Sequence, residues 1–419
     1  MAQSMTDQMK WVSALSTQPS LEAAIHDVVE HAQQSLQAPA DLGLVFISSA
    51  FASEYSRLMP LLKEKLEVSV LIGCSGGGVV GMNTVDQSEE IEGGAALSLT
   101  VAHLPGVTVT PFHVTDDELP DLDGPPDRWI DLMGVSPNEH PDFIVLSDPT
   151  FSKVVDLLQG LDFAYPGSVK VGGLASGGAL RGGIGLFYND RMYEDGMVGI
   201  ALSGDVTLEA IVAQGCRPIG GIYQVVEGDR NIILKLEEQI RDDVCGIAQT
   251  PLEVLQALIQ DLSEDDRELA QHSLFVGIAQ TEFKRELDQG DFLIRNLIGV
   301  DPRIGAIAVG DRIRPGQRIQ FHLRDAATSA DDLEGLLKHY QYTDQTRTTS
   351  PIGALMFSCM GRGERLYNEQ NFDSRLFSHY VSNVPVAGFF CNGEIGPVGD
   401  TTFIHGYTSV FGIIRQAAS

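Results

Sequence analysis

The sequence predicts a mixed α/β protein (α+β mixed) made of two repeated lobes, each a mixed β-sheet with helices packed on one face. The first observation is a repeated glycine pattern. GCSGGGVVG (73–81) and GFFCNGEIG (388–396) both carry glycine at their first, sixth and ninth positions, and GLASGG (173–178) keeps the first two of these. Glycines that follow apolar runs are typical of strands that cross too closely for a side chain. The pattern therefore indicates an internal repeat.

The spacing of these motifs is the second observation. The intervals are 25 residues from Ser48 to Gly73, 26 from Ser147 to Gly173 and 30 from Ser358 to Gly388. Each interval fits a strand, a helix and a returning strand, and a right-handed crossover of this length places both strands in one sheet. Further β-rich runs follow each pair, which excludes an all-parallel sheet. We therefore expect strand–helix–strand–meander units in which Gly73, Gly173 and Gly388 are equivalent.

The individual elements follow in order along the chain. Residues 20–36 predict an amphipathic helix with Ser20 as its N-cap. The runs 42–48, 143–148 and 350–359 predict the strands that open the three units. Helical segments follow each of them, and the glycine motifs mark the returning strands. The predicted boundaries are an N-terminal helical segment over 1–40, a first lobe over 41–220 and a second lobe over 221–419.

Composition limits the partners and the compartment. The chain has 419 residues and a formal net charge of −29, so it repels nucleic-acid phosphates and anionic lipid headgroups. The sequence has no run of about 18 unbroken apolar residues, the length that a membrane helix needs. Its five cysteines are an odd number, which favours free thiols in a reducing compartment. We expect a cytoplasmic protein without disulfides that binds neither nucleic acid nor membrane.

The segment 385–407 gathers the candidate site residues. Cys391, Glu394 and His405 lie within fifteen residues of one another, with Asn392 and Gly393 between the first two. Glu394 is the strongest candidate, because its small and apolar neighbours are unusual for a glutamate that only aids solubility.

Two arginines in tight turns, Arg217 in GCRPIG and Arg362 in GRG, either bind turn carbonyls or offer a fork to a ligand carboxylate. The sequence leaves these two roles equally open. We predict one pocket in which Glu394 and Arg217 or Arg362 hold a zwitterion, with Cys391 and His405 in the wall.

Other interpretations of the same residues remain open. Cys391 or Cys359 with His405 could form the catalytic pair of a thiol-dependent enzyme, although a free cysteine is more often an inert buried side chain. His405 could ligate non-covalent haem, although a buried, hydrogen-bonded histidine is the commoner case. The glycine motifs could bind phosphate, but they lack the spacing of known phosphate loops, and close packing of strands accounts for them better.

Several motifs together resemble the FIST family. They are GCRPIG, FLIRNLIGVDPRIGAIAVGD with IRPGQRIQFHLRD, SCMGRG, and AGFFCNGEIGPVG followed by FIHGYT. The resemblance runs from about Leu42 to Arg415, with an N-terminal and a C-terminal FIST region. One departure is that Val79 stands in GCSGGGVVG where GFFCNGEIG has Glu394, so a carboxylate function is not expected in the first repeat.

The resemblance implies a sensory protein of intracellular signalling that binds a small ligand such as an amino acid. Some family members carry an F-box ahead of the FIST regions, but only about forty residues with one helix precede the first predicted strand here, so none is expected. Some bacterial members resemble haem proteins that sense nitric oxide and act on a kinase or cyclase. This sequence has no kinase or cyclase segment, so any output is expected to pass through a separate partner protein.

Overall fold

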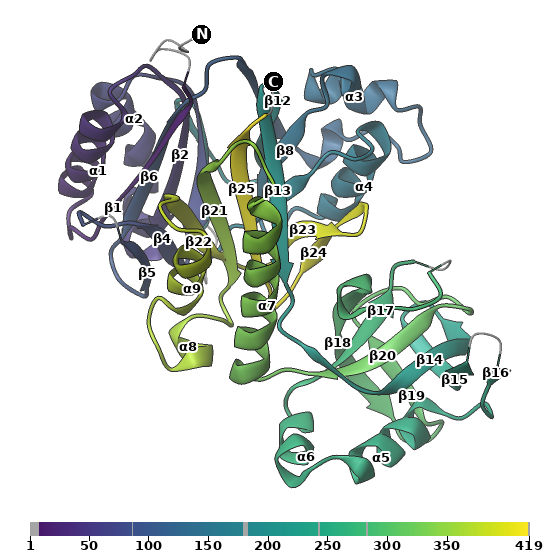
Figure 1. Ribbon diagram of the computed structural model, residues 1–419. Coiled ribbons are helices and arrows are strands. Elements are labelled where there is room, and N and C mark those ends of the chain that lie inside the picture. Colours follow the sequence, from purple (N-terminus) through teal and green to yellow (C-terminus); the bar gives the residue numbers. More distant parts are fainter. Residues whose placement is uncertain (1–7, 86, 179–182, 242–243, 282–283, 418–419) are drawn as a thin grey trace. The chain divides into compact units, whose positions relative to one another are not determined.

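The computed structural model describes residues 8–85, 87–178, 183–241, 244–281 and 284–417 (Figure 1). The chain forms two compact units, one combining Met1–Ala213 with Glu334–Ser419 and the other consisting of Gln214–Leu333. The mixed α/β class is confirmed. The division differs from the expected lobes over 41–220 and 221–419, because strands from both parts of the sequence pair in the same sheets.

Three successive segments of the first unit share one element order (Figure 1). The first repeat contains β1 (Lys10–Ser16), α1 (Leu21–Leu36), β2 (Ala40–Ser48), η1 (Ser49–Glu54), α2 (Tyr55–Lys65), β3 (Val68–Gly76), the hairpin of β4 (Gly78–Met82) and β5 (Ser88–Glu92), and β6 (Leu97–His103). The second repeat contains β7 (Val107–Val114), η2 (Asp116–Glu118), α3 (Asp127–Met133), η3 (Pro137–Glu139), β8 (Asp142–Ser147), α4 (Val154–Ala164), β9 (Lys170–Leu174), the hairpin of β10 (Leu186–Tyr188) and β11 (Arg191–Tyr193), and β12 (Met197–Gly204). The third repeat contains β13 (Val206–Ala213) and, after the strands of the second unit, α7 (Ala326–Asp344), β21 (Pro351–Cys359), α8 (Glu364–Tyr367), α9 (Phe372–Tyr380), β22 (Val386–Cys391), the hairpin of β23 (Glu394–Val398) and β24 (Thr401–His405), and β25 (Ser409–Gln416).

The three repeats build three six-stranded sheets with the same plan. The strand orders are β1-β6-β2-β3-β10-β11, β7-β12-β8-β9-β23-β24 and β13-β25-β21-β22-β4-β5. In each sheet the two middle strands are the parallel pair of one strand–helix–strand crossover. The last two strands of each order form a hairpin that another repeat supplies. The first repeat gives its hairpin to the third sheet, the second repeat gives its hairpin to the first sheet, and the third repeat gives its hairpin to the second sheet. The exchange is cyclic and interlocks the repeats.

One glycine in each parallel pair explains the repeated motif. A Cβ atom on Gly73 would lie 1.9 Å from the carbonyl oxygen of Val45 on the neighbouring strand. The corresponding distances are 1.8 Å from Gly172 to Val145 O and 1.8 Å from Gly388 to Met356 O. Contacts this short exclude any side chain, so glycine is required. The expected equivalence holds for Gly73 and Gly388, but in the second repeat Gly172 and not Gly173 occupies the position.

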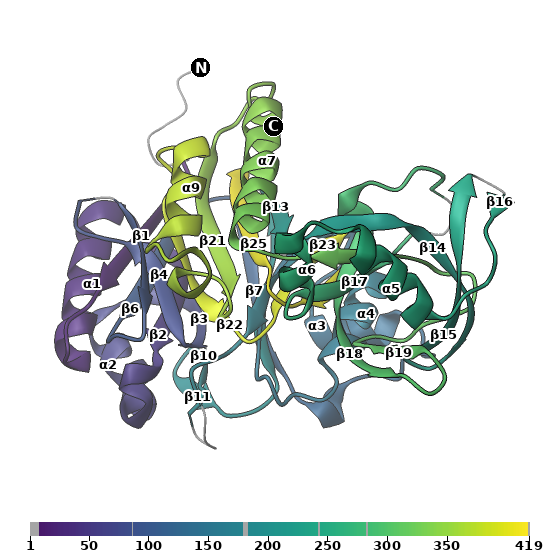
Figure 2. The same ribbon diagram turned by 90° about the horizontal axis from the view of Figure 1, so that it is seen from below.

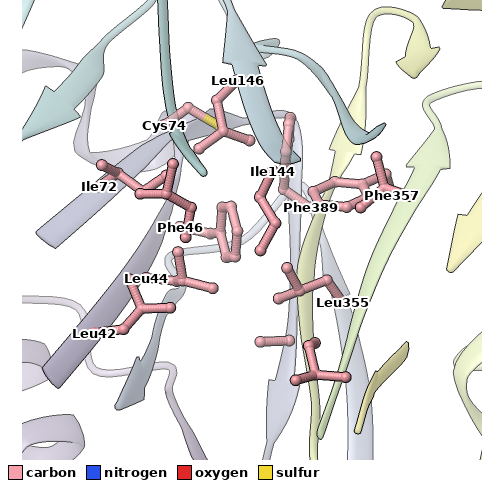
Figure 3. Close-up of a cluster of buried hydrophobic side chains, with 14 of the residues drawn as sticks. Leu42, Leu44, Phe46, Ile72, Cys74, Ile144, Leu146, Leu355, Phe357 and Phe389 are labelled. Carbon is pink, nitrogen blue, oxygen red and sulfur yellow. The ribbon is translucent and has the colours of Figure 1, made fainter. Parts of the chain in front are cut away.

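The inner faces of the three sheets share one apolar core (Figure 3). It joins side chains from the first strand of every parallel pair, Phe46 of β2, Ile144 of β8 and Phe357 of β21. The ring of Phe389 from β22 stacks on Phe46 at 5.3 Å between centroids. Because this core draws on all three repeats, none of them can bury its inner face alone.

Helices cover the outer faces of the sheets (Figure 2). Helices α1 and α2 form a second apolar cluster with the first sheet, and α3 and α4 form a third with the second sheet. On the third sheet, Phe377 of α9 stacks on Phe411 of β25 at 4.8 Å. The predicted helix over 20–36 is confirmed, since the Ser20 side chain accepts a hydrogen bond from Ala23 N in front of α1. The strand β1 before it was not predicted.

The second unit is a small barrel with two helices. Its strands are β14 (Arg217–Asp229), β15 (Ile232–Arg241), β16 (Val244–Cys245), β17 (Leu274–Ala279), β18 (Phe292–Asp301), β19 (Ala306–Val309) and β20 (Arg318–Leu323), with α5 (Pro251–Asp261), α6 (Glu264–Ala270) and η4 (Gln289–Asp291). The sheet order is β14-β20-β17-β18-β19-β15-β16, and a further β14–β15 pairing closes six of the strands into a ring. The barrel is thus inserted between β13 and β21 of the third repeat.

Candidate functional site

The chain passes from one sheet to the next at three points that are hydrogen-bonded to one another. Gly77 N donates to Ser176 Oγ at 2.8 Å, and Ser176 N donates to Ser75 O at 3.1 Å. Asn392 N donates to Leu174 O at 3.0 Å, and Leu174 N donates to Gly393 O at 2.8 Å. We call the segments 75–77, 174–176 and 391–393 the crossover hub. It lies at the carboxyl ends of the parallel strands, where open α/β sheets commonly bind ligands.

Glu394 is the first residue of β23 and is completely buried beside this hub. Its Oε2 accepts a hydrogen bond of 3.1 Å from the backbone N–H of Thr408, whereas its Oε1 has no hydrogen-bond partner among the described residues. Burial raises the pKa of this carboxyl to about 8, although the Thr408 N–H, the positive charge of Arg362 and the thiol of Cys359 act in the opposite direction. Glu394 is therefore mostly protonated at neutral pH.

Arg362 is also completely buried, and its guanidinium is held by a protein carboxylate. It binds Asp373 of α9 through two bonds, Nε to Oδ2 at 2.7 Å and Nη2 to Oδ1 at 3.0 Å. The same group donates to Tyr367 Oη and, at 3.5 Å, to the carbonyl oxygen of Tyr407. Parallel bonds of this kind are among the strongest side-chain contacts. The sequence left open that Arg362 binds turn carbonyls or a ligand carboxylate; in the structure its fork is bound by the Asp373 carboxylate, and Tyr407 supplies a carbonyl contact at 3.5 Å.

Glu90 of β5 is a second buried carboxyl with the same bonding pattern. Its Oε1 accepts a bond of 2.7 Å from Ser374 N, and its Oε2 has no partner among the residues described. Burial, followed by the negative charge of Asp373, raises its pKa to about 7. Glu90 thus lies on the hairpin that the third sheet receives, and Glu394 lies on the hairpin that the third repeat supplies. The charge of Asp373 raises the pKa of Glu90, and the charge of Arg362 lowers that of Glu394. Sequence reasoning missed Glu90 and Asp373, because neither stands in an apolar or glycine-rich setting.

The cysteines of the site are close to one another but differ in exposure. Cys359 and Cys391 are register partners on the parallel strands β21 and β22. Cys391 is completely buried, and burial raises its pKa well above the usual value, with further effects from Glu394, Cys74 and Cys359. Cys359 is partly exposed, and its sulfur accepts a bond of 3.4 Å from Gly361 N. Among the described residues, Cys74, Cys216, Cys359 and Cys391 form no disulfide, and the side chain of Cys245 lies outside the described part of the chain.

The remaining predicted site residues have different environments. His405 lies opposite Glu394 in the β23–β24 pair, is 3% exposed and contacts Gly396 O through Nε2 at 3.0 Å. Gly393 is buried and Asn392 is exposed. Arg217 lies in the second unit, on β14, where it forms ion pairs with Asp266 and, at 4.0 Å, with Asp325. Six of the seven predicted residues are therefore in the first unit.

Two surface hollows lie elsewhere in the first unit. They measure about 650 and 330 Å³ and share Leu66, Val68 and Ser69 in their linings, near the amino ends of β2 and β3. None of the predicted site residues lines either hollow. Among the described residues, no helix is both long and apolar enough to cross a bilayer.

Comparison with known proteins identifies related chains. The "Uncharacterized protein Rv0628c" of Mycobacterium tuberculosis is 31% identical over 397 residues, which cover 94% of this chain and 97% of that protein. The "Uncharacterized protein Mb0898c" of Mycobacterium bovis is 35% identical over 267 residues, covering 64% of this chain and 65% of that protein. Human F-box only protein 22 is 32% identical over 80 residues, covering 15% of this chain and 20% of that protein.

Two family models match most of the chain. The FIST N domain matches residues 41–239, and the FIST C domain matches residues 251–397. Both matches include part of the barrel, so the boundary between them falls inside the second unit. The glycines of the parallel strands and Glu394 lie within these matches, whereas the motif FIHGYT (403–408) lies beyond the end of the second match. The chain therefore belongs to the FIST family, with both its N-terminal and its C-terminal domain.

Proposed function

We propose that this protein is a cytoplasmic sensory protein of signal transduction that binds an amino acid or a related small acid at the crossover hub. FIST domains are associated with small-ligand sensing in signal transduction. The observation that carries the proposal is Glu394, a completely buried carboxyl with one oxygen left without a hydrogen-bond partner among the described residues. Such an oxygen is costly unless another group comes to bind it.

The chemistry of Glu394 favours a ligand with an ammonium group. An ammonium beside the free oxygen would stabilise the carboxylate form and offset the desolvation that keeps the group protonated. Arg362 adds a fixed positive charge that already favours this form. Because the fork of Arg362 is bound to Asp373, the ligand's own carboxylate would be held by exposed groups such as Asn392.

The turn over Glu394 offers a route for entry. Thr408 N–H is the group that holds Oε2, and the preceding residue Tyr407 has a left-handed backbone with φ of 62°. A left-handed conformation is strained for a large side chain and is often found at functional sites. Tyr407 is 36% exposed and Met360 is 43% exposed, so movement of this turn would connect the buried carboxyl with solvent. A ligand that displaces the turn would change a surface that a separate partner protein, of the kinase or cyclase type, can detect.

A thiol-dependent enzyme and a haem sensor are less well supported. Nucleophilic attack requires a thiolate, and burial raises the pKa of Cys391 well above its usual value. The Nε2 of His405 contacts the carbonyl oxygen of Gly396, which is the pattern of a structural histidine. We therefore propose binding without catalysis.

A thermal-shift screen tests the proposal. A ligand at a hundredfold excess over its dissociation constant adds about 2.7 kcal/mol to stability, which corresponds to a rise of roughly 5 °C or more in the melting temperature. We expect at least one amino acid or small acid to give such a rise, and Glu394→Gln to abolish it. Glu90→Gln is the matched control, because Glu90 shares the burial and bonding pattern of Glu394 and should leave the response intact. A ligand response that survives Glu394→Gln, or the absence of any response together with no co-purified small molecule by mass spectrometry, would refute the proposal.

A further inference from the structure

Each exchanged hairpin is tied by polar side chains to a helix of the repeat that receives it. In the first sheet, Lys63 of α2 forms an ion pair of 3.6 Å with Asp190, which lies between β10 and β11. In the second sheet, Asp162 of α4 accepts bonds of 2.7 and 2.8 Å from the backbone N–H and the hydroxyl of Thr402 on β24. We call these contacts, and those between β5 and α9 in the third sheet, the three hairpin ties.

The third tie has a carboxyl at its centre. Glu90 Oε1 accepts a bond of 2.7 Å from Ser374 N in the first turn of α9, and Glu90 N donates at 2.6 Å to the side-chain oxygen of Asn371, the N-cap residue of this helix. The hydroxyls of Ser88 and Ser378 lie 3.0 Å apart farther along the same two elements. The first repeat therefore supplies the carboxyl that caps a helix of the third.

The charges of the first two ties are balanced. Lys63 and Asp190 have opposite charges, and Asp162 is paired with Lys170, whose Nζ lies 2.9 Å from Asp162 Oδ1. Neither tie requires a proton in order to be neutral.

The third tie depends on a cation that is already bound. Asp373 of α9 is the first charged group that acts on Glu90, and it holds Arg362 through two bonds of 2.7 and 3.0 Å. Asp373 and Arg362 are completely buried, and Glu90 is 5% exposed. Ionised Glu90 would therefore add a second buried negative charge beside a pair that is already neutral.

The other elements packed around Glu90 do not supply a positive charge to offset this. The strand β4, its neighbour in the hairpin, has the sequence GVVGM and carries no charge. Glu92 of β5 adds a further negative charge. The remaining charged side chains of α8 and α9 are exposed, where water and salt screen them (Glu364, Arg365, Arg375 and His379). Burial and then the charge of Asp373 accordingly raise the pKa of Glu90 to about 7.

We propose that the tie between Glu90 and α9 is a pH-dependent latch, which holds β5 against α9 while the carboxyl is protonated and loosens when the proton is lost. Movement of β5 away from α9 lets water solvate the carboxylate, which removes the cost of burying it. Among the described residues, β4 pairs with β22 at two positions, Val79 and Val80, so the contacts with α9 contribute to holding this hairpin. The latch goes beyond the proposed function, because no contact of the ligand enters into it.

Hydrogen exchange followed by mass spectrometry tests the latch in the full chain. In the open state the pKa of Glu90 returns toward its ordinary value of 4.5, against about 7 in the closed state. The opening equilibrium therefore rises between these two values and is constant above the higher one. After correction for the intrinsic exchange rate at each pH, the protection of 88–92 and 372–380 should fall up to about tenfold per pH unit between pH 5.5 and 7 and level off above pH 7.

Two comparisons separate the latch from a general loss of stability. Glu90→Gln keeps the acceptor oxygen and cannot lose a proton, so β5 and α9 should stay protected across the range. The β10–β11 hairpin is the internal reference, because its tie is a balanced ion pair, and its protection should not follow the same curve. Glu394→Gln should retain the fall in β5 and α9, since the latch does not use that residue.

The inference is overturned if the parent protein shows no fall in β5 and α9, or if Glu90→Gln shows the same fall. An equal fall in β10–β11 would also overturn it, because the change would then be global. If Glu90→Gln does not fold, the comparison of the two hairpins within the parent protein decides.

Discussion

Glu394 of β23 lies directly opposite Gly173 of β9, which places a carboxyl of the third repeat in the sheet of the second. The space that a side chain at Gly173 would need is filled by Cys391, since a Cβ there would lie 2.4 Å from Cys391 Sγ. A buried, partly unsatisfied acid at such a junction affects both the stability and the binding chemistry of the protein, and the following predictions test these effects.

Stability should fall as the pH rises from about 4.5 to 8. Glu394 and Glu90 have pKa values near 8 and 7 in the folded protein, against 4.5 as their ordinary value. The folded state therefore binds more protons than the unfolded state in this window, and each group contributes stability that is complete below 4.5 and lost as the pH passes its folded pKa. The slope is roughly 1 kcal/mol per pH unit for each group. Urea unfolding at several pH values should show this decline and a shallower one for Glu394→Gln, whereas the exposed Glu64→Gln should match the parent protein.

Ligand affinity should change with pH in the opposite sense. An ammonium ligand binds the carboxylate form of Glu394, and this form becomes more abundant as the pH approaches the pKa of about 8. Affinity should therefore rise up to about tenfold per pH unit between pH 6 and 7.5 and then level off. Titration calorimetry in buffers of different ionisation enthalpy should detect proton release. An affinity that is flat over this range would mean that the ligand does not meet the carboxylate of Glu394.

Substituting the glycine of any parallel pair should be severely destabilising. A Cβ atom at Gly73, Gly172 or Gly388 would overlap a backbone carbonyl at 1.8–1.9 Å, and a backbone contact cannot be relieved by turning a side chain. We expect each Gly→Ala variant to lose several kcal/mol or to be insoluble. Gly335→Ala is the control, since nothing lies within 4 Å of its Cβ position in α7. Equal melting temperatures for Gly172→Ala and Gly335→Ala would contradict the assigned equivalence.

Removing one partner of the buried Arg362–Asp373 ion pair should lower the free energy of unfolding more than replacing both partners. Arg362→Met leaves the buried Asp373 without its bidentate partner, and such single changes cost about 3–5 kcal/mol. Arg362→Met combined with Asp373→Leu removes both charges and should recover a large part of this loss. Denaturant unfolding of the two single variants and the double variant forms a cycle that measures the coupling. Purely additive losses would show that the two residues stabilise the fold separately.

The four described thiols should react at different rates. Cys359 is partly exposed, whereas Cys74, Cys216 and Cys391 are no more than 2% exposed. Iodoacetamide under native conditions should therefore label Cys359 first and the other three only as the protein unfolds. Peptide mass spectrometry over time separates the sites. Rapid labelling of Cys391 at neutral pH would instead favour the thiol-enzyme interpretation.

The sequence was informative wherever a local pattern determines the structure. The repeated glycines and the apolar runs predicted the parallel pairs, because the close approach of two strands leaves only one residue type at the crossing. The position in the second repeat was displaced by one residue, because GLASGG begins at the second of two adjacent glycines, Gly172 and Gly173, and only backbone register distinguishes the two. Glu394 stood out because its neighbours are small and apolar.

Long-range pairing could not be predicted in the same way. The edge positions that β4–β5, β10–β11 and β23–β24 occupy depend on contacts between distant parts of the chain, and a period-two pattern gives no information about the partner strand. For the same reason the sequence did not indicate that three sheets interlock by exchanging hairpins, or that a barrel is inserted in the third repeat. Asp373, the partner of Arg362, was missed because it lies on a helix that reaches the site only through the tertiary fold.

The cyclic exchange of hairpins has a consequence for dividing the protein. A fragment cut at residue 240, between the two family regions, would lack β23–β24 for its second sheet, and the complementary fragment would lack β4–β5 for the third. Neither half should fold alone, yet the two expressed together should reassemble by fragment complementation, each supplying the edge strands that the other is missing. The barrel behaves differently, because its excision leaves every strand of the three sheets in place. It is the part of the chain that can be exchanged for another module while the interlocked body is retained.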